Sequence, residues 1–469
     1  MFKLSSLLAF ILIPLSTFAQ EPVVTFRQSK MVGVVRLIDS LASLGVASPA
    51  LKIIHNRTLG RDRKSLELIA RVQKEEIGRS QVDRMYTLAA ASKSKEELKF
   101  LIYGLRKNRK ADEKPYLAFL EAIDHFTPRY EKLARIAAKP IRQLLHHLRS
   151  KKMRRLTTEL VRKTTRFYRA ELPIKEIDIV IVPLVGLKPK EKLTRSQSLG
   201  PLQVVEVILP SEKFSHYGVV IHEIAHYCQA HSKPLERAFA HVKKVSKTHG
   251  GLLKQSIFNE ALATAIGNGY AEKRAGLKWS KRWYENTVYD KYAKALYDKT
   301  KEYLLENKEL DESFADHSLQ TFKRLFPNIH KKPNTVFRSI FLATQGFESK
   351  GLALLLRSKF PIEEMDLSSP ISHPFTKEGF LESANKTKIF LLPPRQLAVL
   401  KSFSGLEYEK VQTIAQSKES FLFVHWSDKW RSFFIVVVAN KEKDGKRLME
   451  KLFTKDKIDE GLYLASEND

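Results

Sequence analysis

The chain has 469 residues, of which 43% are hydrophobic, and it carries a formal net charge of +29. This length is typical of two or three domains, and the apolar content excludes a wholly disordered protein. A single cysteine, Cys228, excludes an intramolecular disulfide, and we expect this residue to be a buried, inert thiol.

The first 19 residues have the pattern of a secretory signal peptide. Lys3 precedes an apolar run from Leu7 to Leu15, and small residues lead to Ala19. We therefore predict cleavage after Ala19 and an exported protein, periplasmic or secreted, of a bacterium. The apolar run is too short to span a bilayer, and no later stretch approaches 18 apolar residues, so we predict no transmembrane segment.

Residues 20–172 are predicted to form a basic, helical N-terminal domain. Residues 139–169 contain eleven basic side chains and one acid, Glu159. Such a charge excess favours an anionic surface or polymer as partner, such as a wall polymer, nucleic acid or membrane headgroups. The alternative is an ordinary solvated helix face without a specific partner.

Two short strands are predicted next, over 177–184 and 203–209, separated by a polar, basic loop over 186–200. Helices follow from 255 to about 360. The predicted fold class is therefore α+β and mainly helical, with a small sheet at its centre.

Directly after the second strand, residues 222–226 read His-Glu-Ile-Ala-His, which is the HExxH pattern. On a helix, His222 and His226 lie one turn apart on the same face, where one Zn²⁺ can bind both. Glu223 is then placed to take a proton from a metal-bound water. The flanking residues are uncharged, and buried histidines need a partner such as zinc. The alternative is two surface histidines on an amphipathic helix.

A catalytic zinc needs a third protein ligand, and Glu260 is the candidate. It is the single acid of an apolar helix that spans 256–268, where a lone carboxylate needs a cation or hydrogen bonds. The alternative is an acid on the surface of that helix. His231 does not fit, because the spacing of the metzincin pattern would place a histidine at Ser232.

HExxH followed on a later helix by Asn-Glu-Ala-Leu-Ala resembles the gluzincin branch of the zincin metallopeptidases. The resemblance covers about 60 residues, from the 203–209 strand to Gly269. It implies one zinc ion bound by His222, His226 and Glu260, with Glu223 as general base. It also implies a zincin-like core, with a small sheet beside the HExxH helix whose edge strand pairs with the substrate. We expect this edge at 200–210.

The chain departs from the gluzincin pattern four residues after Glu260, where an aspartate that orients a zinc histidine is replaced by Thr264. We expect Thr264 and Asn259 to support the ligands. Gluzincins also use a Tyr or His donor for the oxyanion. The candidates that follow the Glu260 helix are Tyr270, Tyr289, Tyr292, Tyr297 and His317.

The predicted metallopeptidase domain spans 173–360, and a Pro/Ser-rich connector spans 361–385. Residues 386–469 are predicted to form a small α+β domain without a chemical motif. Its predicted elements are strands near 389–392, 421–426 and 433–438 and a closing helix over 441–453.

Together these patterns predict an exported zinc metallopeptidase that hydrolyses peptide bonds with a zinc-activated water and Glu223 as general base. One alternative is an exported basic binding protein whose zinc site is structural or vestigial. Another is a zinc amidase that acts on a non-peptide or wall amide. An intact Glu223 favours an enzyme, because a structural site needs no base.

Overall fold

The chain divides into two compact units in a computed structural model. The first contains Met1–Leu235 and Asn259–Leu310, and the second contains Glu236–Phe258 and Asp311–Asp469. The structure describes residues 22–45, 47–75, 77–107, 116–187, 195–209, 216–245, 255–360, 362, 364–383, 386–416 and 419–465. The predicted signal peptide, residues 1–19, lies outside these ranges. Both units combine helices with a mixed sheet, which confirms the mainly helical α+β class. No described helix combines the length and the apolarity that crossing a bilayer requires.

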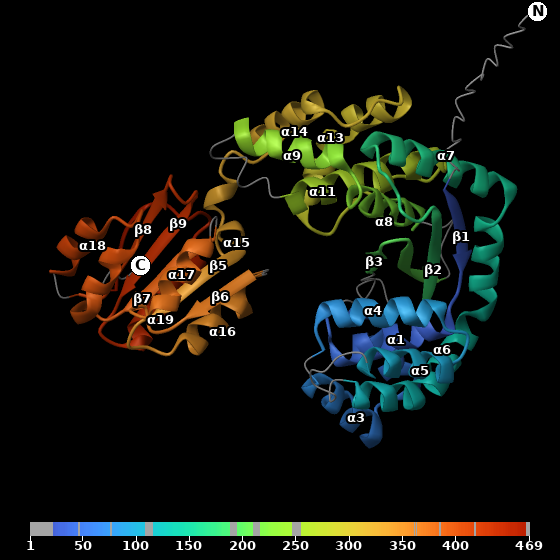
Figure 1. The fold of residues 1–469 in the computed structure, drawn as a ribbon, viewed down its shortest axis with the longest axis horizontal. Coiled ribbons are helices and arrows are strands. Elements are labelled where there is room, and N and C mark those ends of the chain that lie inside the picture. The colour runs from blue at the N-terminus through green and yellow to red at the C-terminus, as the bar shows by residue number, and fades with distance from the viewer. Residues whose placement is uncertain are drawn as a thin grey trace, which may run out of the picture. The chain divides into compact units, whose positions relative to one another are not determined.

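A four-stranded sheet forms the centre of the first unit (Figure 1). Its strand order is β1 (Val23–Arg27), β2 (Glu176–Val185), β4 (Leu202–Leu209) and β3 (Ser196–Leu199). The predicted strands correspond to β2 and β4, whereas β1 and β3 were not predicted. Both are short edge strands, and β3 is entirely polar except for Leu199, so neither has a clear hydrophobic pattern.

The position of β4 corrects the prediction that residues 200–210 form the substrate edge. This strand pairs with β2 on one side and with β3 on the other, so it lies inside the sheet. The edge next to the HExxH helix is β3. A polar strand of four residues within a predicted loop carries too little pattern to be recognised from the sequence.

One face of this sheet packs against the N-terminal helices (Figure 1). Val180, Val182 and Val204 share a core with apolar side chains of these helices. The longest helix, α6, continues through Pro128 and Pro140, and α7 begins after Ser150, whose side chain caps it. The helices are α1 (Lys30–Ala42), α2 (Pro49–Leu59), α3 (Arg63–Lys74), α4 (Arg79–Ala91), α5 (Lys95–Lys107) and α6 (Leu117–Leu148).

The opposite face of the sheet carries the HExxH helix. Helix α7 (Lys151–Tyr168) packs on β1, and α8 (Tyr217–Gln229) packs on β3 and β4. Helix α11 (Gln255–Thr264) continues as the π-helix η3 (Ala265–Ala271), which packs against α8. The remaining helices are α12 (Glu272–Arg274) and α13 (Thr287–Leu305).

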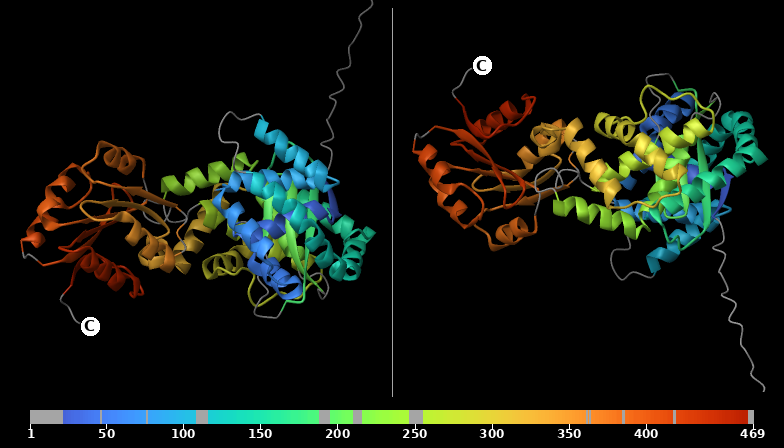
Figure 2. Two further views of the ribbon diagram at one scale, coloured as in Figure 1. Left: turned by 90° about the horizontal axis from the view of Figure 1, so that it is seen from below. Right: turned by 90° about the horizontal axis from the view of Figure 1, so that it is seen from above.

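A six-stranded mixed sheet forms the second unit, with helices on both of its faces (Figure 2). Its order is β10 (Gly461–Leu464), β8 (Phe421–Ser427), β9 (Ser432–Val438), β7 (Thr387–Leu392), β5 (Ser339–Thr344) and β6 (Glu364–Ser368). Its helices are α14 (Glu312–Leu325), η4 (Ile329–Lys331), α15 (Pro333–Val336), α16 (Ser349–Lys359), α17 (Pro374–Glu382), η5 (Pro394–Ser402), α18 (Tyr408–Ala415) and α19 (Glu442–Phe453). Helix α9 (Lys233–Val245) contains the boundary at Leu235.

The predicted strands β7, β8 and β9 and the closing helix α19 are all present. By contrast, residues predicted as a connector form β6 and α17, and β5 lies in a stretch predicted as helical. Strand β5 is buried along its whole length, and a short, continuous apolar run has no period that separates strand from helix. Strand β6 is an exposed edge strand without clear alternation.

Candidate metal centre

Three predicted ligands meet between α8 and α11. Nε2 of His222 and Nε2 of His226 are 3.0 Å apart, and they lie 3.5 and 3.4 Å from the two carboxylate oxygens of Glu260. A tetrahedral zinc with bonds of about 2.0–2.1 Å holds its ligand atoms about 3.3 Å apart. The two imidazoles therefore present one nitrogen each and Glu260 presents a carboxylate at the spacing that zinc requires, and among the described residues Glu260 Oε2 is buried without a hydrogen bond.

The second nitrogen of each imidazole has a hydrogen-bond partner that orients the ring. Nδ1 of His222 lies 3.5 Å from Oγ1 of Thr264, and Nδ1 of His226 lies 2.7 Å from Oε1 of Gln229. When both imidazoles are neutral and protonated at Nδ1, as they are when they bind a metal through Nε2, the two Nε2 lone pairs face each other and the Glu260 carboxylate. A cation between them removes this repulsion, so the donor set fits a divalent metal.

The electrostatics of the cluster agree with this assignment. Burial lowers the pKa of His226, but the Glu260 carboxylate outweighs burial, and the pKa is raised to about 9. Burial also raises the pKa of Glu260, but the two histidines hold it far below its usual range. The protein thus surrounds this point with groups that favour positive charge, whether a proton or a metal ion provides it.

Both predicted supporting residues contact the ligands or their partners, but Asn259 does so through its main chain. The amide nitrogen of Gln229 donates to the Asn259 carbonyl at 2.8 Å and to the Tyr168 hydroxyl at 2.9 Å. These bonds orient Gln229 so that its oxygen faces His226. Gln229 was not predicted, although its position three residues after His226 places it on the same helix face.

A glycine allows the two metal-binding helices to approach. A Cβ at Gly267 of η3 would lie 2.3 Å from the carbonyl oxygen of Gly218 and 2.7 Å from the main-chain nitrogen of His222. Only a residue without a side chain fits there. The π-helical turn therefore packs its backbone directly on α8, which fixes Glu260 opposite the histidines.

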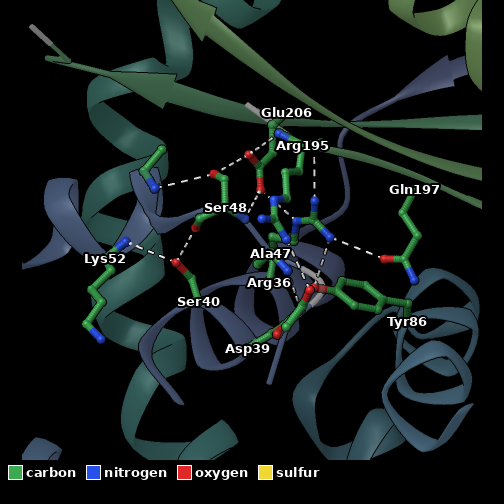
Figure 3. A network of polar contacts seen from close by, with 12 residues as sticks. Arg36, Asp39, Ser40, Ala47, Ser48, Lys52, Tyr86, Arg195, Gln197 and Glu206 are labelled. Carbon is green, nitrogen blue, oxygen red and sulfur yellow. Dashed lines mark hydrogen bonds and ion pairs between the residues drawn. The ribbon is translucent and has the colours of Figure 1, made fainter. Parts of the chain in front are cut away.

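Glu223 is buried beside the cluster, and Oγ of Ser196 on β3 donates a short hydrogen bond to its Oε1. Arg195 and Gln197, the two residues that flank Ser196, are bound by Arg36 on the opposite side of the strand. Arg36 is fully buried and donates to the Gln197 side chain, to the Arg195 carbonyl and to Glu206 (Figure 3). With Gln197 held on one side, its neighbour Ser196 faces Glu223 on the other.

The cluster opens into a cavity of about 950 Å³ whose wall includes Ser196, Ser198, Asn268 and Tyr284. None of the predicted oxyanion donors lines this cavity. Tyr292 is fully buried, and Tyr297 packs against Trp279 and Trp283. Tyr270 is buried on η3, Tyr289 packs edge-on against Tyr284, and His317 lies on α14 of the second unit.

Tyr284 is the aromatic hydroxyl next to the candidate metal position. Its ring stacks on His222 with centroids 6.0 Å apart, and its pKa is raised by burial and by the charge of Glu260, so the phenol keeps its proton. Asp290 accepts hydrogen bonds from the main-chain nitrogens of Trp283 and Tyr284 at 2.6 and 3.3 Å. These bonds hold the loop against α13.

Other predictions concern residues outside the cluster. Cys228 is buried, and burial raises its pKa to about 12, as expected of an inert thiol. Several basic residues of 139–169 form hydrogen bonds and ion pairs with other residues of the first unit. Arg149 donates to the carbonyl of Phe26, Lys163 to that of Leu304 and Arg166 to that of Asn307, while Arg169 pairs with Glu309.

Comparison of the chain with protein-family models, with curated proteins and with solved structures gives no match.

Proposed function

We propose that the protein is a zinc-dependent metallopeptidase of gluzincin type with a zincin-like core. The observation that carries the proposal is the convergence of His222, His226 and Glu260 at metal-ligand spacing, beside Glu223 and at the wall of an open cavity. A structural zinc site is usually closed by a fourth protein ligand, whereas the described residues supply three to this cluster, which supports a catalytic role.

Zinc bound here would act as a Lewis acid and would lower the pKa of a coordinated water. Glu223 takes the proton from the attacking water and delivers it to the leaving amine. The Ser196 hydroxyl orients the Glu223 carboxylate through its hydrogen bond. Tyr284 has kept its proton and lines the same cavity, so it can donate to the oxyanion of the tetrahedral intermediate.

The edge strand β3 supports a polypeptide as substrate. The carbonyl of Arg195 accepts from the main-chain nitrogen of Glu206 and thus points toward β4. In an antiparallel pair, main-chain N–H and C=O groups point toward the partner strand at every second residue and away from it at the residues between. The residues of β3 whose main-chain groups point away from β4 are therefore Ser196 and Ser198. Both residues line the cavity, so an extended peptide can pair with them beside Glu223.

Metal analysis and one substitution test this proposal. The purified protein should contain one zinc per chain, and Glu223→Gln should keep the metal and lose hydrolysis of quenched peptides by at least about a thousandfold. Glu176→Gln, which removes an exposed acid at the start of β2, is the matched control. Equal hydrolysis by the Glu223→Gln variant would contradict the proposal.

A panel of wall-derived amides beside the peptides separates a peptidase from an amidase, because both use the same site chemistry. We also propose that the enzyme acts after export, in the periplasm or outside the cell, on the basis of residues 1–19. Metal-free protein that binds a wall polymer, nucleic acid or anionic vesicles through residues 139–169 without hydrolysis would instead support the basic binding protein.

A further inference from the structure

Three arginines line the cavity that contains the metal ligands. Arg79 is the first residue of α4, Arg195 directly precedes β3, and Arg282 lies in the loop that leads to Tyr284. They come from three separate parts of the first unit, and all three are exposed. Their convergence on one cavity gives it a cationic wall.

Within the described ranges, none of these arginines forms an ion pair. The guanidinium of Arg195 donates to the carbonyl of Gly45 at 3.2 Å, which is a neutral acceptor. By comparison, Arg27 and Arg71 elsewhere in the first unit pair with Asp178 and Glu121. The charges on the cavity wall are therefore available to a ligand.

The four acids that line the cavity divide between the metal site and the rest of the wall. Glu260 belongs to the metal site, and Glu223 is engaged by Ser196. Asp83 accepts a hydrogen bond of 2.5 Å from the amide of Gln197, which Arg36 orients in turn. Asp83 and Glu285 together offset two positive charges, so the three arginines exceed by one the acids that lie away from the metal site.

We propose that this cavity selects acidic peptides, in which carboxylates flank the scissile bond and bind Arg79, Arg195 and Arg282. The planar guanidinium matches a carboxylate with two parallel hydrogen bonds, which gives orientation as well as attraction. This inference rests on the proposed function, because it names the substrate class of the same site. It also assigns the three arginines as residues that determine specificity.

The test measures binding and does not need turnover. The full chain carrying Glu223→Gln is loaded with zinc, and fluorescence anisotropy follows a labelled peptide with glutamates on both sides of an apolar pair. A twin peptide has glutamines at those positions. Because the whole chain is strongly basic, the comparison among arginine variants decides the outcome.

We expect Arg79→Gln, Arg195→Gln and Arg282→Gln each to weaken binding of the acidic peptide about fivefold and to leave the glutamine twin unchanged. Arg84→Gln removes the same charge from an exposed position of α4 outside the cavity, and it should change neither affinity. Equal affinity for the two peptides, no binding of either, or an equal effect of Arg84→Gln would overturn the inference.

Hydrolysis by the wild-type chain separates this inference from the proposed function. Arginine-dependent binding of the acidic peptide without cleavage contradicts the peptidase and supports the anionic specificity. Cleavage of both peptides at equal kcat/KM supports the peptidase and overturns the specificity.

Discussion

Oγ1 of Thr264 lies 3.5 Å from Nδ1 of His222, at the sequence position where the gluzincin pattern has an aspartate. The side chain of Thr264 is completely buried, so this hydroxyl is a neutral partner in a dry environment. A neutral partner orients the imidazole but makes it less basic than a carboxylate does. The site therefore depends more on Glu260 and Gln229 to hold a metal.

Thr264→Val should lower the zinc affinity about tenfold, because it removes the partner of the His222 ring without changing the volume of the side chain. Competition with a fluorescent chelator measures this affinity. Thr300→Val is the matched control, since Thr300 is equally buried but its hydroxyl donates to the carbonyl of Leu296 on α13. Equal zinc affinities in the two variants would argue against a role for Thr264.

Tyr284→Phe should lower kcat about a hundredfold while zinc content and KM stay close to wild type, because the lost hydroxyl acts on the oxyanion and not on the bound ground state. Tyr297→Phe serves as the control. Its hydroxyl is buried in the aromatic cluster of Trp279 and Trp283, and the sequence predicted Tyr297, and not Tyr284, as a candidate donor. A larger loss of kcat in Tyr297→Phe would exclude Tyr284 as the donor.

The contrast between these two tyrosines shows what the sequence can predict about the site. His222 and His226 can be recognised from their spacing of one helical turn. Glu260 can be recognised because it is a lone acid in an apolar helix, where it needs a partner. Tyr284 lies in a loop without periodicity, and its main-chain bond to Asp290 and its packing on Tyr289 and His222 place it beside the metal ligands. The role of Ser196 is equally hard to predict from the sequence, because its strand is short and polar.

The same distinction applies to the fold. Strands β2, β4, β8 and β9 are long apolar runs bounded by polar segments, and the sequence predicts all four. Strands β1, β3, β6 and β10, which the sequence did not predict, lie at sheet edges, where less burial is required and the pattern weakens. Long-range pairing, such as that of β1 with β2, leaves no local mark in the sequence.

Gly267→Ala should destabilise the first unit by about 1–3 kcal/mol and weaken zinc binding, because the new methyl group forces η3 away from α8. Gly104→Ala is an informative control. A Cβ at Gly104 meets no atom within 4 Å, so this change in α5 should stabilise the protein by up to about 1 kcal/mol. Urea unfolding and chelator competition measure both effects, and the same sign in both variants would contradict the packing argument.

Arg36→Met should cost about 3–5 kcal/mol of unfolding free energy, because it leaves the Glu206 carboxylate buried without its cation. Burial opposes the charge of Arg36, but Tyr86 and Glu206 hold its pKa above the usual range, so the guanidinium is charged in the folded protein. Adding Glu206→Gln to this variant should recover part of the loss, since no unpaired charge remains. A double variant as unstable as Arg36→Met alone would refute the ion-pair explanation.

Glu272→Gln should remove one source of the pH dependence of stability. Glu272 is 6% exposed, and burial, opposed by a hydrogen bond with Asn268, raises its pKa from 4.5 to about 8. Below pH 4.5 this side chain is protonated in both the folded and the unfolded chain. As the pH rises from 4.5 to 8, the unfolded chain releases the proton and the folded chain retains it, so the folded state loses stability.

The loss amounts to about 1.4 kcal/mol for each pH unit, or on the order of 3–5 kcal/mol across the window. Urea unfolding at pH 5, 6.5 and 8 should therefore show the Gln variant gaining stability relative to wild type as the pH rises. Glu176→Gln, at an exposed position, should keep the wild-type pH dependence. Parallel curves for Glu272→Gln and wild type would mean that Glu272 is ionised in the folded protein, and the close packing of its carboxylate on Gly218 would then need a cation beside it.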